Sequence, residues 1–327
     1  MSAYLPYPDW LTPRVAPGLP VRWYGVMYVV AFVLTYALFC HEARRSGLSD
    51  DRDEISRFFT WIIAGALLGG RLFFVFVFTD SQPFIERPWT IFWPFDEGRF
   101  TGIQGMSYHG GFIGVVVGTI GYAVSRKQNI LDWGDVLAVS APLGYTFGRI
   151  GNFINGELLG RVSAAPWAVL FPQSRRVPIG SEFAVAMADA AGIAIAPGMT
   201  LVNLPRHASQ LYEAALEGLV LWLVLWFAFR TRRMFRGSLI GLYTLGYGIA
   251  RFLAEYFRQT NEEIGFVLTI GRAHAHVALT DSLLHFTEGH VYSLVMAGIG
   301  LIVLIACRVL RRREPVVQTF ESNPAPH

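Results

Sequence analysis

The feature that most constrains this chain is a series of apolar runs, each long enough to cross a bilayer. A membrane-spanning helix needs about 20 predominantly apolar residues, and charged residues make up only 16% of this sequence, against roughly 25% in soluble domains. The sequence therefore predicts an all-α integral membrane protein, a single membrane domain over 1–327 that forms a bundle of seven transmembrane helices. The expected spans are 23–40, 58–78, 103–123, 136–153, 211–229, 239–256 and 291–309.

Basic residues indicate how the bundle is oriented. Arginine-rich segments follow the first, third, fifth and seventh spans, whereas the loop between the second and third holds only Arg87 and Arg99. Because cytoplasmic loops carry an excess of Lys and Arg, we expect the N-terminus outside and the C-terminus in the cytoplasm. The mixed, proline-containing stretch 155–208 is then an extramembrane insert between spans four and five, on the outer side. Residues 311–327 are expected to be a flexible cytoplasmic tail.

One polar stretch, 148–160, stands at the end of an apolar run. It carries Arg149, Asn152, Asn155 and Glu157 among four glycines. Unpaired polar groups at membrane depth are costly, so they mark functional sites by default. The glycines weaken a regular helix and allow the backbone to approach another group closely. An ordinary interfacial helix end is the alternative, and four polar residues in this spacing favour function over it.

Further polar residues lie in other spans. Tyr247, Arg251 and Glu255 are spaced four apart and so share one helical face, which predicts an Arg251–Glu255 ion pair. By topology, Arg149, Arg251 and His109 converge on the outer half of the membrane. Arginine binds phosphate in a bidentate manner, and the anion available at that depth is a phospholipid head group. His109 is either a general base or an ordinary interfacial histidine.

Several other classes of site find no support in the sequence. Cys40 and Cys307 are the only cysteines, which excludes a disulfide framework, and His274 with His276 is too small a set for a metal. We therefore expect neither a metal nor a cofactor. The arginines fall at the ends of apolar runs rather than on a basic face, so no nucleic acid is expected as a partner.

Six segments together carry a resemblance to a known family. The stretch 148–160 resembles, position by position, the signature of bacterial prolipoprotein diacylglyceryl transferases. The chain departs from the family pattern at Ala208, where proline is usual, at 289–296, where the last span begins, and in the loop 261–290. The other segments that agree are 23–25, 69–71, 105–111, 206–213 and 247–255.

The resemblance implies an activity and its partners. It implies transfer of a diacylglyceryl group from phosphatidylglycerol to the lipobox cysteine thiol in the signal peptide of a preprolipoprotein, in the bacterial inner membrane among other membrane lipids. The implied fold is a seven-span helical bundle with a periplasmic insert. Catalysis would fall to His109, Arg149 and Arg251. The substrate-binding set would comprise Tyr24, Arg71, Asn152, Asn155, Glu157, His207, Gln210, Tyr247 and Glu255.

Two other functions remain open from the residues alone. A transporter or flippase for an anionic lipid or solute would also place charged residues in its spans, although such proteins often contain internal repeats and none is visible here. A membrane scaffold would use its buried charges only to fix helix register. In that case, replacing Arg149 or Arg251 would alter folding rather than chemistry.

Overall fold

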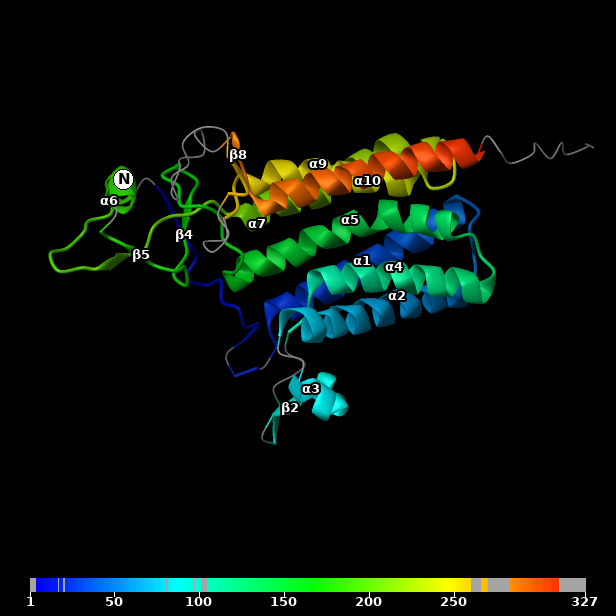
Figure 1. The fold of residues 1–327 in the computed structure, drawn as a ribbon, viewed down its shortest axis with the longest axis horizontal. Coiled ribbons are helices and arrows are strands. Elements are labelled where there is room, and N and C mark those ends of the chain that lie inside the picture. Colours follow the sequence, from blue (N-terminus) through cyan, green and yellow to red (C-terminus); the bar gives the residue numbers. More distant parts are fainter. Residues whose placement is uncertain are drawn as a thin grey trace, which may run out of the picture. The chain divides into compact units, whose positions relative to one another are not determined.

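The computed structural model of this chain is mostly helical, with short two-residue strands (Figure 1). It describes residues 4–16, 18–19, 21–79, 82–96, 98–100, 105–180, 182–259, 266–269 and 283–311. The chain divides into two compact units, one formed by Met1–Phe32 with Ala141–His327 and the other by Val33–Ser140. Helices α1 (Trp23–Arg45) and α5 (Ile130–Asn155) each contribute to both units.

The unit Val33–Ser140 is built on two helices in close contact. Helix α2 (Arg52–Phe73) continues as the π-helix η1 (Phe74–Phe78) and packs against α4 (Tyr108–Arg126). A Cβ added to Gly114 would fall on the carbonyl of Gly65, so the two backbones touch. Small residues recur every four positions along α4, at Gly110, Gly114 and Gly118, and allow this close contact. The chain segment that connects the two helices contains α3 (Gln82–Glu86), η2 (Pro88–Ile91), β2 (Phe95–Asp96) and β3 (Arg99–Phe100).

The core of this unit is aromatic. Phe39, Phe58 and Trp133 are fully buried, and their ring centroids lie 4.9 to 5.8 Å apart, with Phe39 stacked on both of the others. Tyr122 closes the cluster against Phe58 and Trp133. Rings of this size bury large apolar areas, so this cluster joins α1, α2, α4 and the start of α5.

The unit of residues 1–32 and 141–327 contains three further long helical segments. The first, Ser209–Arg232, is continuous and consists of α7 (Ser209–Glu213), η3 (Ala214–Val220), α8 (Leu221–Leu223), η4 (Val224–Phe229) and η5 (Arg230–Arg232). The others, α9 (Ser238–Glu255) and α10 (Glu288–Arg311), pack closely on each other, because a Cβ on Gly248 would lie 2.6 Å from the Ala297 amide nitrogen.

Between α5 and α7 the chain combines a short helix with short strands. It contains α6 (Glu182–Ala190) and the antiparallel pair β5 (Val177–Pro178) and β6 (Leu201–Val202). Strand β4 (Val169–Leu170) pairs in parallel with β1 (Leu5–Pro6) near the N-terminus. A small apolar core around Ala184, Ala188 and Leu204 holds this region together. Near α10, β7 (Leu268–Thr269) pairs with β8 (His285–Phe286).

The expected apolar runs fall on helices, several of which extend beyond the run, whereas one helix starts later than expected. The third run was expected from 103, but α4 begins at Tyr108, after the N-cap Ser107, whose hydroxyl accepts a hydrogen bond from the Gly110 amide. A hydroxyl at this position satisfies one of the free amides of a first turn, which explains the later start. Residues 312–327 of the expected tail and 270–282 of the divergent loop lie outside the described residues.

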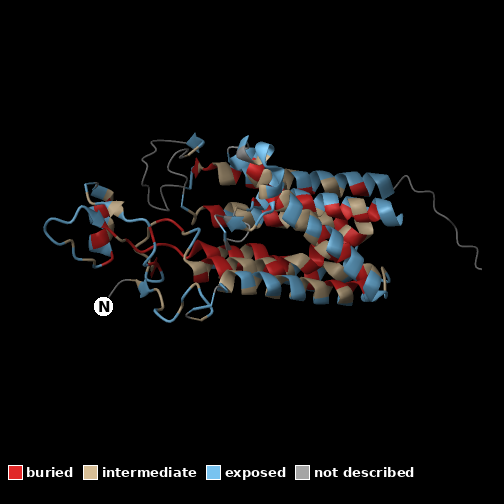
Figure 2. Ribbon diagram, turned by 90° about the horizontal axis from the view of Figure 1, so that it is seen from below, coloured by how far each residue is buried: buried red, intermediate tan, exposed pale blue. Residues whose placement is uncertain are grey.

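Four helices among the described residues are long and apolar enough to cross a membrane. Exposed positions cover the outward faces of the long helices (Figure 2), and on α10 they include Leu294, Ile302 and Ile305. Apolar faces of this extent suit lipid rather than water. The protein is therefore a mostly helical membrane protein. The four helices are Trp23–Arg45, Arg52–Phe78, Ser209–Arg232 and Glu288–Arg311.

Candidate active site

The end of α5 places one arginine against the start of the helical segment Ser209–Arg232. Arg149 Nη1 lies 2.9 Å from Glu213 Oε2, and its Nε donates a 2.7 Å hydrogen bond to the hydroxyl of Tyr145, one turn earlier. That hydroxyl donates in turn to Glu217 Oε2 at 2.5 Å. The π-helix η3 begins directly after Glu213, and its Gly218 packs against Thr146 with no room for a side chain. Close packing thus brings both glutamates to α5.

Helix α9 supplies the second half of the network. Arg251 pairs with Glu255 on the same helix, Nη2 to Oε2 at 2.7 Å, which confirms the predicted intrahelical ion pair. Its Nη1 lies 3.8 Å from Glu217 Oε1. Just beyond the helix, Arg258 contacts both Glu213, at 2.9 Å, and Glu255, at 3.5 Å. These contacts join three arginines and three glutamates into one network, which consists of Arg149, Arg251, Arg258, Glu213, Glu217 and Glu255.

This network balances its charges, with three arginines against three glutamates. The side chains differ in access, however: those of Glu213 and Glu217 are fully enclosed and that of Glu255 is 8% exposed, whereas the arginine side chains are 14 to 22% exposed. An approaching group therefore meets guanidinium first. Carboxylates hold each of the three arginines in place.

The tip of α5 and the segment after it form a second polar group. Asn152 Nδ2 donates a 2.8 Å hydrogen bond to Glu157 Oε1, and the Asn155 side-chain oxygen is buried without a hydrogen-bond partner in the described chain. Gly156 has a φ of +67°, which lets the chain turn sharply at the helix end. Tyr24 packs on Gly151 and shares a 2.9 Å hydrogen bond with Tyr28.

Three expected binding residues contact other parts of the chain. Gln210 is fully buried and donates to the Glu157 carbonyl at 2.5 Å. His207 is buried against Tyr212, with 3.2 Å from its Nδ1 to the tyrosine hydroxyl. Burial, together with Arg161 nearby, lowers the pKa of His207 below its usual value. Tyr247 is buried with its ring 5.9 Å from that of Tyr145.

Two further expected residues belong to the unit Val33–Ser140. His109 is exposed in the first turn of α4, its ring edge-on to Tyr108. Its convergence with Arg149 and Arg251 stays a prediction. Arg71 is buried and donates to the backbone carbonyls of Ile91 and Gly105, so it supports the approach to α4.

The sequence reasoning missed several members of the network. Glu213 and Glu217 stand four residues apart inside an apolar run, the same spacing that singled out Tyr247, Arg251 and Glu255, so a signal for them was present. Thr287, which donates to Glu255 Oε1 at 2.8 Å, and Tyr145 carry no such signal, because neither residue type is unusual where it stands. Among the described residues, no group of three or more His, Cys, Asp or Glu is placed to hold a metal.

Comparison with known proteins extends the similarity along nearly the whole chain. The family model described as prolipoprotein diacylglyceryl transferase matches residues 14–306. A phosphatidylglycerol--prolipoprotein diacylglyceryl transferase of Treponema denticola is 40% identical, with 96% of this chain and 98% of the relative covered. Proteins of the same name from Treponema pallidum, 41% identical with 95% and 97% covered, and Borreliella burgdorferi, 32% identical with 94% and 95% covered, are also similar.

Proposed function

The chain belongs to the prolipoprotein diacylglyceryl transferase family, and we propose that it transfers a diacylglyceryl group from phosphatidylglycerol to the lipobox cysteine thiol of preprolipoproteins. In this reaction the glyceryl carbon–oxygen bond to the phosphate breaks and a carbon–sulfur bond forms. The thiol proton is removed, and the head group leaves as glycerol phosphate. The products are a thioether-linked lipid on the protein and a free phosphate monoester.

The observation that carries this proposal is the set of accessible guanidiniums backed by enclosed carboxylates. A phosphate that leaves an sp³ carbon gains negative charge, and preorganised cations stabilise that charge. Arg149 and Arg251 are the family-motif arginines in this network, and each is held by at least one glutamate. We assign them to the phosphate, with Glu255 orienting Arg251.

The thiol must also lose its proton, because the thiolate is the nucleophile. We assign His109 as the general base, since a neutral imidazole can accept a proton and His109 is exposed rather than enclosed. The alternative is that the arginines alone lower the pKa of the incoming thiol. Asn152, Asn155 and Glu157, at the tip of α5, are assigned to the head group or the peptide, with Tyr24 and Tyr247.

The remaining expected residues position this machinery. Arg71 supports the backbone before α4, which carries His109. Gln210 and His207 hold the segment after α5, because Gln210 bonds the Glu157 carbonyl and the His207 carbonyl accepts from the Gly160 amide at 3.1 Å. A shift of this segment would displace Glu157 and Asn152 together.

We further propose a seven-span topology. The helices α4, α5 and α9 coincide with expected apolar runs, so they would complete the bundle beside the four segments already long enough to cross. The insert 155–208 and the N-terminus would be periplasmic, and the C-terminus cytoplasmic, in the bacterial inner membrane.

The activity is tested with purified protein, phosphatidylglycerol and a lipobox peptide. We expect lipid-modified peptide and an equal amount of glycerol phosphate. A folded preparation that moves lipid between leaflets but modifies no peptide would instead support a flippase. Arg251→Ala is expected to abolish turnover. If His109→Ala keeps near-full turnover, His109 is not the base, while the transferase assignment stands.

A further inference from the structure

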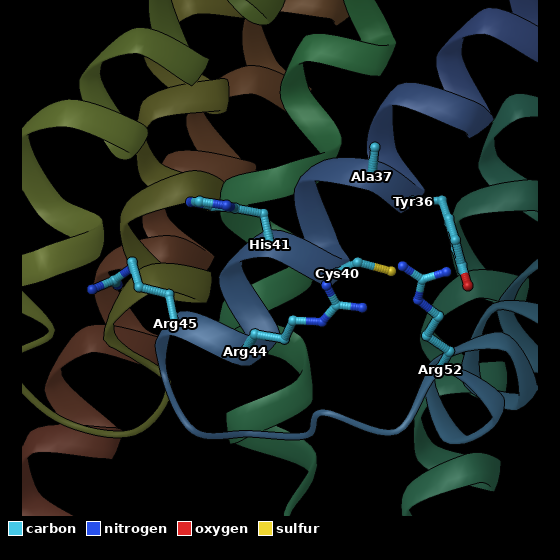
Figure 3. A pocket seen from close by; sticks show the side chains of 7 residues that line it. All are labelled: Tyr36, Ala37, Cys40, His41, Arg44, Arg45 and Arg52. Atoms are coloured by element: carbon cyan, nitrogen blue, oxygen red, sulfur yellow. The ribbon is translucent and has the colours of Figure 1, made fainter.

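A cavity of about 670 Å³ lies beside the end of α1, within the unit Val33–Ser140 (Figure 3). Its size is within the range of small-molecule sites, about 300–1,000 Å³. One wall is made by Tyr36, Ala37 and Cys40, on consecutive turns of α1. The rim is basic, and no acidic side chain is among the described residues that line it.

The basic residues of the rim differ in how their charge is used. Arg45 is engaged by the buried Glu42, with 2.8 Å from Nε to Oε2. Arg44 and Arg52 are exposed and have no ion-pair partner in the parts of the chain that the structure describes. Both guanidinium groups point toward Cys40 from opposite sides of the cavity (Figure 3). The cavity thus presents two uncompensated positive charges above an apolar wall.

The apolar wall continues along the helix. Val33, one turn before Ala37, is 60% exposed. A ligand that fits both features has an anionic head and an apolar tail. Two arginines that face each other across a space suit a phosphate, which accepts bidentate hydrogen bonds from guanidinium.

We propose that this cavity binds an anionic phospholipid, with Arg44 and Arg52 holding the phosphate and the Tyr36–Cys40 face of α1 holding the start of an acyl chain. None of these residues belongs to the arginine–glutamate network or to the family segments that carry the proposed reaction. The bound lipid is therefore a resident ligand rather than a donor in the reaction. Free glycerol phosphate carries the same phosphate group, so the test must distinguish a bound phospholipid from a bound soluble phosphate ester.

Cys40 offers a direct readout, because it lines the cavity while Cys307, the other cysteine, is buried. The experiment uses the full chain with Cys307→Ala in a neutral detergent and measures the rate of Cys40 alkylation by N-ethylmaleimide. Dioleoylphosphatidylserine is the lipid probe, since it has the anionic phosphate but is not the proposed donor. We expect it to slow alkylation at least about fivefold, and sn-glycerol 3-phosphate at equal concentration to have no effect.

The double variant Arg44→Gln/Arg52→Gln removes the charges and keeps the apolar wall. Two lost charge-assisted contacts are expected to raise the lipid concentration for half-protection by at least about tenfold, while transferase activity at saturating phosphatidylglycerol stays unchanged. The matched control is Arg126→Gln, which is exposed in the same unit and does not line the cavity. In this control variant, phosphatidylserine should protect Cys40 from alkylation as well as it does in the parent protein.

Three results would overturn the proposal. Equal protection by phosphatidylserine in the double variant, with its melting temperature unchanged, would show that the arginines do not hold the ligand. Equal protection by glycerol phosphate would make the ligand a soluble phosphate ester. Equal protection by a neutral diacylglycerol would show that only the apolar wall, and not the arginines, binds the lipid.

Discussion

Among the individual residues of the network, the carboxylates matter as much as the arginines. Glu213 is fully buried and is the one side chain, among the described residues, that contacts both Arg149 and Arg258. Removing one partner of a buried ion pair is strongly destabilising, because the other charge is left uncompensated. Glu213 therefore fixes the geometry of two guanidiniums at once.

Glu213→Gln tests this role. We expect transferase kcat/KM to fall at least about 100-fold, since one preorganised electrostatic contact commonly contributes that much, and the free energy of unfolding to fall by about 3 kcal/mol. Both are measured on detergent-purified protein, by peptide modification and by thermal melting. The control Asp189→Asn, exposed on α6, should change neither. Full activity in Glu213→Gln would place the reaction away from this network.

The single residues also show where prediction from sequence stops. Arg149 and Arg251 were identified because a charge at membrane depth is rare, and the structure joins them in one network. The substrate-binding role expected of Arg71 came from the family resemblance, and in the structure its guanidinium donates to the backbone carbonyls of Ile91 and Gly105. Rarity identifies a constrained residue but does not tell whether a ligand or the chain itself supplies the partner.

Among the secondary-structure elements, the α2–α4 contact depends on the absence of side chains. Gly65 and Gly69 of α2 face Gly110 and Gly114 of α4 so closely that any Cβ would overlap a carbonyl. Small residues allow this approach in membranes, where van der Waals packing drives helix association. The glycine spacing of α4 therefore accounts for the close packing of this pair of helices.

Gly114→Ala is expected to lower the free energy of unfolding by about 1–3 kcal/mol, because overpacking a tight contact forces the backbones apart. Thermal melting in detergent measures the effect. Gly111→Ala is the matched control on the same helix, since its Cβ would sit 3.6 Å from the Ala66 carbonyl oxygen, an ordinary contact. Equal melting temperatures for the two variants would contradict the close contact.

The segment that leads into α7 should respond to pH. Burial and Arg161 lower the pKa of His207 in the folded protein, whereas an unfolded histidine titrates near 6.5. Below that pH the unfolded chain binds a proton that the folded chain resists, so the free energy of unfolding falls as pH falls, by up to about 1.4 kcal/mol per pH unit. Well above pH 6.5, His207 does not make the free energy of unfolding depend on pH. Melting of His207→Asn should be less sensitive between pH 7 and 5 than melting of the parent, while His41→Asn should match the parent.

For the whole molecule, apolar run lengths and loop arginines predicted a membrane protein of helices, and the structure confirms the mostly helical membrane character. Run length could not predict the π-helical turns at Ala214–Val220 or the late start of α4, because local hydrogen bonding decides both. The mixed fold between α5 and α7 depends on pairings such as β1 with β4, which join residues far apart in the sequence.

The proposed orientation can be measured on intact cells. In a background without Cys40 and Cys307, Asp189→Cys on α6 should react with a membrane-impermeant maleimide, because the insert is proposed to be periplasmic. Arg126→Cys at the end of α4 should react only after the membrane is permeabilised. The opposite pattern would reverse the topology, and labelling of both in intact cells would mean that α4 and the insert face the same side.

The neutrality of the arginine–glutamate network has a consequence for product release. Three unpaired arginines would bind a phosphate dianion tightly and keep it, which would slow every later cycle. In this transferase three glutamates already pair with the three guanidiniums. Bound glycerol phosphate therefore only replaces one set of ion pairs by another, and it gains little free energy by staying. On the proposed assignment of these arginines to the phosphate, we expect the site to favour the charge distribution of the reacting phosphate over that of the departed one. We expect it to exchange the water-soluble product for the next lipid without a separate step to expel the product.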